Sequence, residues 1–243
     1  MRNLLAGVAM LMAAVPAAAT PRNDARGAMA RKTPALDFSY RYPPAAARLA
    51  PLRRWLDADR ARFRADAVRD ATADERERGS GIPFHQHVAT REWKVVTETA
   101  RLLSMSGETY RFTGGAHGGT LLEALVWDKT RATRVDPRAM FASPAALQRV
   151  WGATWCARLK AERTGRLQGA PGADDIFPCP PVAALTLLPG STDGRAIDRI
   201  GLVAGQYVAG SYAEGMYEIT LPVTPALLAI VRPQWRGVFA PGR

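Results

Sequence analysis

The segment with the most potential for chemistry is a glycine-rich stretch, residues 112–120, which contains one histidine. Four of the six positions 114–119 are glycine, and His117 lies among them. Glycine permits backbone conformations that other residues avoid, and it lets backbone N–H groups approach a ligand closely. We therefore expect a binding loop that presents His117; the alternative is a tight, buried connection in which His117 is hydrogen-bonded in place. The candidate ligand contacts in this loop are Gly114, Gly115, His117 and Gly118.

No familiar catalytic signature accompanies this loop. A phosphate-binding loop has Lys-Ser or Lys-Thr after its last glycine, and an esterase with a similar His-Gly-Gly string needs a Gly-x-Ser-x-Gly nucleophile; the sequence contains neither pattern. We therefore expect a protein that is not an enzyme and that needs no cofactor.

The three histidines allow one alternative. His85 and His87 alternate, so on a strand they point to the same face, and His117 supplies a third nitrogen ligand. The alternative function that this arrangement would support is a metal-dependent hydrolase with a three-histidine zinc site. Because the chain has only these three histidines, the spacing alone does not favour a metal, and we expect none.

A second candidate binding segment covers residues 205–215. It contains Tyr207 and Tyr212 among small residues, followed by Glu214. Exposed tyrosines on a shaped loop suit protein recognition, because tyrosine offers a large contact area at a low entropic cost. The alternative is a pair of half-buried tyrosines whose hydroxyls bond to the backbone. Tyr207, Tyr212 and Glu214 are therefore the remaining ligand-binding candidates.

The elements that must position these segments follow from periodicity. Apolar residues three, four and seven apart predict a helix over about 45–78, and a Ser-Pro start with a similar stripe predicts a second over about 144–163. Short β-branched or alternating runs between turn residues predict strands. The order of elements predicts an α+β fold with two main helices on a largely antiparallel sheet. The expected strands are 36–42, 93–104, 109–112, 121–128, 182–188, 197–203 and 216–222, and a last short helix is expected over 225–231.

The first nineteen residues are typical of a signal peptide. A short basic start precedes an uncharged apolar run that ends in three alanines, which suits cleavage after Ala19. We expect a periplasmic or secreted protein without a membrane span in the mature chain. Residues 20–35 are predicted to be a flexible leader, and 36–243 a single domain; the alternative is two tightly joined lobes, about 36–105 and 106–243.

Export also makes the two cysteines interpretable. Cys156 and Cys179 are the only cysteines in the chain. A lone pair in an exported protein predicts a disulfide, and without a Cys-x-x-Cys spacing it is a poor zinc site.

The charge balance is strongly basic. Among 243 residues there are 33 Lys and Arg against 22 Asp and Glu, a formal net charge of +11. The densest basic stretch, residues 53–78, is interleaved with acidic residues and is typical of a solvated, ion-paired helix face. We therefore expect no nucleic-acid partner, although attraction to anionic envelope polymers fits the charge.

The two candidate segments together resemble a known exported family. It is a domain of unknown function found in lysozyme-sensing anti-sigma factors and beside the catalytic domain of some peptidoglycan deacetylases. The resemblance spans residues 36–231, with Gln206 where the family pattern has a proline. The residues that carry it are Phe112–His117, Val135, Asp136, Phe141, Tyr207–Ala209, Ser211–Gly215, Tyr217–Ile219, Leu221 and Pro222.

This resemblance implies an envelope-facing domain with a binding role, since the best understood members of the family bind lysozyme. We expect a non-catalytic binding module whose ligand is lysozyme, another envelope protein or a cell-wall component such as peptidoglycan. The alternatives are a lysozyme inhibitor and the metal-dependent hydrolase described above.

Overall fold

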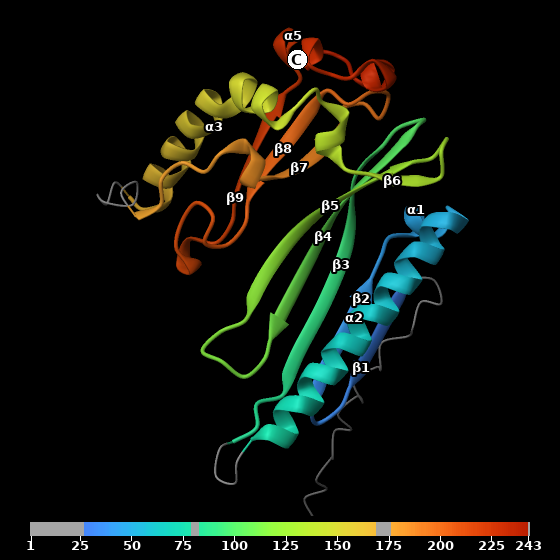
Figure 1. Cartoon of the computed structure of the whole chain (residues 1–243), viewed down its shortest axis with the longest axis vertical. Helices are drawn as coiled ribbons and strands as arrows, with labels where there is room; N and C mark the ends of the chain where they lie inside the picture. Colours follow the sequence, from blue (N-terminus) through green and yellow to red (C-terminus); the bar gives the residue numbers. More distant parts are fainter. Residues whose placement is uncertain (1–26, 79–82, 169–175, 243) are drawn as a thin grey trace, which may run out of the picture.

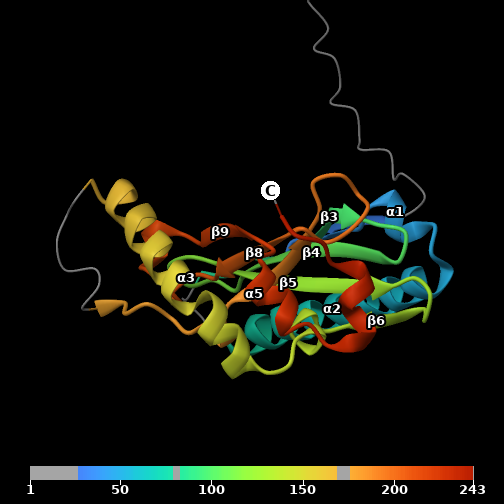
Figure 2. The same cartoon turned by 90° about the horizontal axis from the view of Figure 1, so that it is seen from above.

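The fold consists of four layers in the order helix, sheet, sheet, helix (Figures 1 and 2). The computed structural model describes residues 27–78, 83–168 and 176–242. The predicted α+β class, with two main helices on largely antiparallel sheet, is confirmed. Within the described residues, no helix is both long enough and apolar enough to cross a membrane.

The larger sheet has six strands in sequential order, and all neighbours are antiparallel except β2 and β3. Helices α1 (Pro44–Ala47) and α2 (Ala50–Glu77) connect these two strands, as a parallel pair requires a crossover. The predicted helix over 45–78 is therefore confirmed, with a break between α1 and α2. The strands are β1 Ala28–Lys32, β2 Leu36–Arg41, β3 His87–Glu98, β4 Leu102–Phe112, β5 Gly119–Asp128 and β6 Thr133–Val135.

Helix α2 covers one face of this sheet. Its buried stripe, which includes Leu52, Leu56 and Phe63, packs against aromatic side chains of the strands such as Phe38 and Trp93. These side chains are nearly inaccessible to solvent, and burial of this kind is the main favourable contribution to folding.

The smaller sheet has three antiparallel strands, β7 Thr186–Gly190, β8 Arg199–Ala204 and β9 Tyr217–Pro222. Helix α3 (Pro144–Arg166) covers its outer face, and the Ser143 hydroxyl caps the helix by accepting a hydrogen bond from the Ala146 N–H at 3.1 Å. The second core, between α3 and this sheet, includes Trp151 and Trp155 and extends to Leu102 and Val126 of the larger sheet. The remaining helical segments are α5 Pro225–Ala229 and the 3-10 turns Pro137–Met140, Val182–Ala184, Tyr212–Glu214 and Pro233–Val238.

The predicted disulfide is present: Cys156 on α3 is bonded to Cys179, with the two Cα atoms 5.6 Å apart. It fastens the chain that follows α3 to the helix itself. Close by, the Trp155 indole N–H donates to the Pro180 carbonyl at 3.1 Å, so this region is held by both covalent and polar contacts.

Two predictions about the first half of the chain are wrong. Residues 28–32, expected to belong to a flexible leader, form β1 and pair with β2; this strand is mostly exposed, so it lacks the apolar alternation that would have revealed it. Residues 93–104, expected to form one strand, contain a turn, because the Thr99 hydroxyl accepts from the Leu102 N–H at 3.0 Å and starts β4.

The signal peptide 1–19 and its cleavage site after Ala19 lie outside the described residues and stay a prediction. The same holds for the leader residues up to 26. The two-lobe alternative placed a division near residue 105, but the larger sheet continues through that point to β6.

Candidate functional site

The two segments that the sequence selected meet in space. The glycine-rich residues 113–118 form the turn between β4 and β5, and residues 205–215 connect β8 to β9. The ring of His117 stacks on the ring of Tyr212 with centroids 3.9 Å apart, and Tyr207 lies 6.0 Å from Tyr212. We call these three side chains the aromatic cluster. It joins the turn of the larger sheet to the loop of the smaller one.

His117 is exposed, but both of its ring nitrogens have partners. Nδ1 lies 3.0 Å from the Gly118 carbonyl, and Nε2 lies 3.3 Å from the Tyr207 hydroxyl. A neutral imidazole with its proton on Nδ1 satisfies both contacts, because Nδ1–H donates to the carbonyl and Nε2 accepts from the hydroxyl. The polar groups of the cluster therefore hold the two segments together.

The backbone at Tyr207 is unusual. Residues 205–208 form a turn closed by the Val208 N–H and the Gly205 carbonyl at 3.1 Å, and Tyr207 has φ +63°. Positive φ at the third residue alone defines a type II turn, whose second residue is often proline. That second residue is Gln206, and its side-chain oxygen accepts a hydrogen bond from the Thr120 N–H at 2.7 Å. Gln206 thus keeps the turn and ties it to β5.

Glu214 supports the loop from inside. Its carboxylate accepts from the Ser211 N–H at 2.7 Å and from the Tyr217 hydroxyl at 2.6 Å, and with Ser211 it forms a capping box. Burial alone would raise the pKa of Glu214, but the Tyr217 and Ser211 hydrogen bonds outweigh it, so the pKa lies below its usual range. Arg166 binds the next carbonyls, those of Glu214 and Met216, each at 2.8 Å. The structure therefore gives Glu214 a positioning role within the loop.

The glycines of the turn differ in whether glycine is required at each position. A Cβ on Gly118 would lie 2.3 Å from the ring of Tyr110, so only glycine fits there. Gly114 has φ +90° and lies against His85, whereas the space around Gly115 is open. Tyr110 is a contact that sequence reasoning missed; its place on β4 opposite Thr120 follows from the hairpin register.

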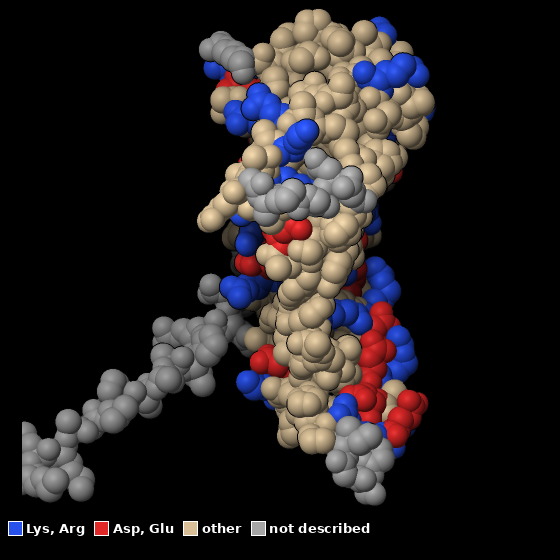
Figure 3. All heavy atoms as spheres, turned by 90° about the vertical axis from the view of Figure 1, so that its left-hand side faces the viewer, with Lys and Arg blue, Asp and Glu red and all other residues tan. Residues whose placement is uncertain are grey.

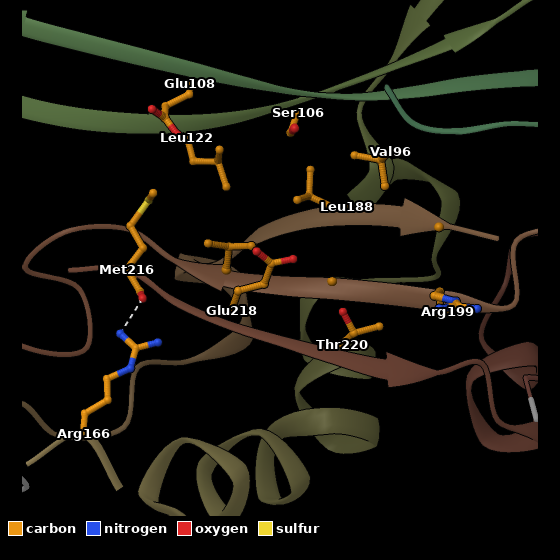
Figure 4. Close-up of a pocket in the computed structure, with 13 residues that line it drawn as sticks. Val96, Ser106, Glu108, Leu122, Arg166, Leu188, Arg199, Met216, Glu218 and Thr220 are labelled. Atoms are coloured by element: carbon orange, nitrogen blue, oxygen red, sulfur yellow. Dashed lines mark hydrogen bonds between the residues drawn. The ribbon is translucent and has the colours of Figure 1, made fainter. Parts of the chain in front are cut away.

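A cleft of about 530 Å³ opens between the two sheets (Figure 4). One wall consists of side chains from β3, β4 and β5, and the other of side chains from β7, β8 and β9. Sequence reasoning did not find this cleft, because its lining comes from six strands that are scattered along the chain. The residues that decide its chemistry are Val96, Ser106, Glu108, Leu122, Arg166, Arg199, Val203, Met216, Glu218 and Thr220.

The charges in the cleft are not balanced locally. Arg166 is bound to Glu162 and to backbone carbonyls, and Arg199 is bound to Asp198 at 3.3 Å. Glu108 on one wall and Glu218 on the other have no ion pair or side-chain hydrogen bond within the described residues. The cleft therefore presents two free carboxylates, one on each wall, among apolar side chains such as Leu122 and Met216.

The surface around the site has no field of one sign. On the face drawn in Figure 3, acidic and basic side chains are interleaved in the lower half, and basic ones predominate in the upper half. The ion pairs on α2, for example Arg69 with Asp66 at 2.9 Å, agree with the expected solvated and ion-paired face.

The structure does not bring the three histidines together. His85 precedes β3 and is exposed, whereas His87 is buried with Nε2 2.9 Å from an Asp74 carboxylate oxygen; the two do not share the strand face that was predicted. His117 lies in the aromatic cluster. Among the described residues, no group of three His, Cys, Asp or Glu side chains could hold a metal ion, so the three-histidine zinc site is wrong.

The comparisons agree with part of the resemblance seen in the sequence. Residues 29–120, from β1 to the end of the glycine-rich segment, match the family model described as Deacetylase PdaC. A DUF3298 family protein from Pseudomonas aeruginosa PAO1 is 19% identical, with a TM-score of 0.57, and the match covers 90% of this chain and 96% of that one. This likeness shows a shared fold along nearly the whole chain.

A second DUF3298 family member, from Bacteroides fragilis NCTC 9343, is 16% identical with a TM-score of 0.41, covering 77% of this chain and 81% of that one. No match was found among curated proteins. The expected similarity to a deacetylase-associated family is thus found over residues 29–120, while the sharing with anti-sigma factors stays a prediction.

Proposed function

We propose that this protein is a non-catalytic binding module of the bacterial envelope that holds a protein or cell-wall ligand at the aromatic cluster. The observation that carries this proposal is Tyr207, which is 55% exposed although it sits in a left-handed backbone conformation. Such a conformation costs free energy for a residue other than glycine, and it is found preferentially where function requires it.

The arrangement of the polar groups supports binding over catalysis. The hydrogen bonds of three polar side chains hold the two loop segments in place: those of His117, Gln206 and Glu214. The result is a rigid, exposed aromatic surface, which binds at a low cost in conformational entropy.

The envelope location rests on three supports. The sequence of residues 1–19 is typical of a signal peptide, the Cys156–Cys179 disulfide suits an oxidising compartment, and the matching family model belongs to a deacetylase. The ligand classes that follow are lysozyme, another envelope protein and peptidoglycan.

The test is a calorimetric titration of the purified protein against a panel of lysozymes and soluble peptidoglycan fragments, with muramidase activity read in the same samples. We expect a Kd of micromolar or tighter for at least one of them. Inhibition of the muramidase would make the protein a lysozyme inhibitor, and binding without inhibition would make it a recognition module.

Two variants make the test specific to the site. Tyr207→Ala is expected to weaken binding at least tenfold. Leu121→Ala is the matched control, because Leu121 has a similar exposure of 57% but lies on β5 outside the aromatic cluster. Binding to no member of the panel, or an equal loss in both variants, would overturn the proposal.

A further inference from the structure

The smaller sheet has two edge strands, β7 and β9; β7 packs against the larger sheet, which leaves the edge of β9 for a partner. The order β7-β8-β9 leaves β9 with one neighbour among the described strands. In its register with β8, the Val223 N–H bonds to the Asp198 carbonyl, so the residues of β9 that bond to β8 are Tyr217, Ile219 and Leu221. The N–H and C=O groups of Glu218 and Thr220 therefore point outward from the sheet.

The neighbouring outward group shows that this edge can be bound from outside. The Met216 carbonyl has the same parity as Glu218, and the Arg166 guanidinium binds it at 2.8 Å (Figure 4). Beyond Met216, Glu218 and Thr220 have no further hydrogen bond within the described part of the chain. Two consecutive outward positions of β9 are thus open to another strand.

The cleft opens toward this same edge. β7 packs against β3, β4 and β5, while β9 lies at the opposite side of the smaller sheet. The side chains of Glu218 and Thr220 line the cleft (Figure 4). A strand added to β9 would therefore place alternate side chains beside the apolar side chains of Leu122 and Met216.

The charge of the cleft selects the kind of strand. Among the described carboxylates, four have neither an ion pair nor a hydrogen bond: Glu75 and Glu77 at the exposed end of α2, and Glu108 and Glu218 in the cleft. In a chain with 33 basic and 22 acidic residues, carboxylates without a cation are unusual. Two of them on opposite walls of one cleft are complementary to a cation.

We propose that the cleft binds an extended, basic polypeptide segment that adds to the free edge of β9. The outward N–H and C=O groups of Glu218 and Thr220 pair with its backbone, as in other cases of strand addition. A lysine or arginine of the segment lies between Glu108 and Glu218, and its apolar neighbours contact Leu122 and Met216. This inference concerns a second site, separate from the aromatic cluster, and names the class of its partner.

The test uses fluorescence polarisation with three labelled peptides of equal length and the purified protein. The first alternates valine and lysine, the second alternates valine and glutamate, and the third is the lysine peptide with methylated backbone nitrogens. We expect micromolar binding of the lysine peptide and at least tenfold weaker binding of the other two. Because the protein is itself strongly basic, general electrostatics would favour the glutamate peptide instead.

Two variants separate the cleft from overall charge. The double variant Glu108→Gln/Glu218→Gln is expected to weaken binding of the lysine peptide at least tenfold. The double variant Glu75→Gln/Glu77→Gln changes the net charge equally and is expected to stay within twofold of the parent. Thr220→Pro removes one outward N–H donor and is therefore expected to weaken binding of the lysine peptide at least fivefold. The variant is expected to fold, because proline is tolerated on edge strands where the N–H faces outward.

The outcomes are distinct from those of the proposed function. No binding of the lysine peptide, an equal loss in both double variants, or equal binding of the methylated peptide would overturn this inference. Lysozyme or peptidoglycan binding that persists in such a case leaves the proposed function standing. Conversely, peptide binding to the cleft without any binding to that panel supports the inference and overturns the proposed function.

Discussion

The two faces of the larger sheet differ in whether their charged side chains have partners. On the face covered by α2, the Asp59 carboxylate accepts from the Tyr40 hydroxyl at 2.7 Å and from the Arg91 guanidinium at 2.9 Å. Arg91 also bonds to the Thr109 hydroxyl at 2.7 Å. On the face toward the smaller sheet, Glu108 has no such partner within the described residues. Polar groups on the first face are thus paired with one another.

This difference separates structural charges from available ones. Burial and the hydrogen bond to Asp59 raise the pKa of Tyr40 far above its usual range. Burial and the hydrogen bond to Asp57 raise the pKa of Tyr42 to about 12. Side chains in such a network are committed to the fold, because removal of one partner leaves the other buried and unpaired. A free carboxylate in an open cleft has no structural task and is available for a ligand.

The largest expected effect is on the α2 face. Asp59→Ala removes the acceptor for Tyr40 and one of the two carboxylates that pair with Arg91, which keeps Glu123 at 3.4 Å. Tyr40 and Arg91 both remain largely buried. We expect the free energy of unfolding to fall by about 2–3 kcal/mol in urea denaturation, because the buried Tyr40 hydroxyl loses its acceptor and Arg91 loses its shorter ion pair. Asp66→Ala is the control, since its pair with Arg69 is mostly exposed and worth about 0.5 kcal/mol. Equal losses in the two variants would remove the distinction between paired and available charges.

A smaller effect is expected in the turn between β4 and β5, which carries His117. Gly118→Ala places a Cβ 2.3 Å from the Tyr110 ring, which must move, and we expect a loss of about 1–2 kcal/mol in the same measurement. Gly119→Ala meets nothing within 4 Å and is expected to be neutral. If Gly118→Ala proved as mild as Gly119→Ala, the turn would be looser than its packing indicates.

The sequence predicted most elements because their patterns are local. The apolar stripe of α2 and the Ser-Pro start of α3 are readable without knowledge of their neighbours. β1 was missed because its side chains are mostly exposed and its only support is pairing with β2. The turn after Glu98 was missed because apolar residues continue on both sides of it.

The candidate site was predictable only in part for the same reason. Glycine and tyrosine content marked the two loop segments, but no local pattern indicates that His117 stacks on Tyr212, 95 positions further along the chain. The tie from Gln206 to Thr120 depends on the register of β4 and β5 and on the turn at Tyr207. The cleft exists only once six strands are assembled, so its carboxylates carried no signal of their own.

Acid should loosen the loop that holds Glu214, because protonation of this carboxylate weakens the hydrogen bonds it accepts. The pKa of Glu214 is lower in the folded protein than in the unfolded chain, so its contribution to stability is present above its unfolded pKa and is lost as the pH falls through its folded pKa. We expect Glu214→Gln to cost about 1 kcal/mol at neutral pH, because a neutral amide oxygen accepts more weakly than a carboxylate from the Ser211 N–H and the Tyr217 hydroxyl. The variant should also make the loop less sensitive to pH below about 4.5. Hydrogen exchange of the Ser211 and Gly215 amides across this pH range measures it. An unchanged pH dependence in the variant would show that another group controls the loop.

The smallest expected effect concerns the stability of the cleft carboxylates. Glu108 stands directly opposite Glu92 in the register of β3 and β4, and like charges in that position repel. Glu108→Gln removes this repulsion without breaking any ion pair or hydrogen bond within the described residues. We therefore expect the free energy of unfolding to rise, by no more than about 0.5 kcal/mol. A loss of 1 kcal/mol or more would mean that Glu108 is committed to the fold like Asp59, and the contrast between the two faces would not hold. A small gain, with binding of the basic peptide lost, would instead identify a carboxylate that the protein keeps for a ligand at the expense of its own stability.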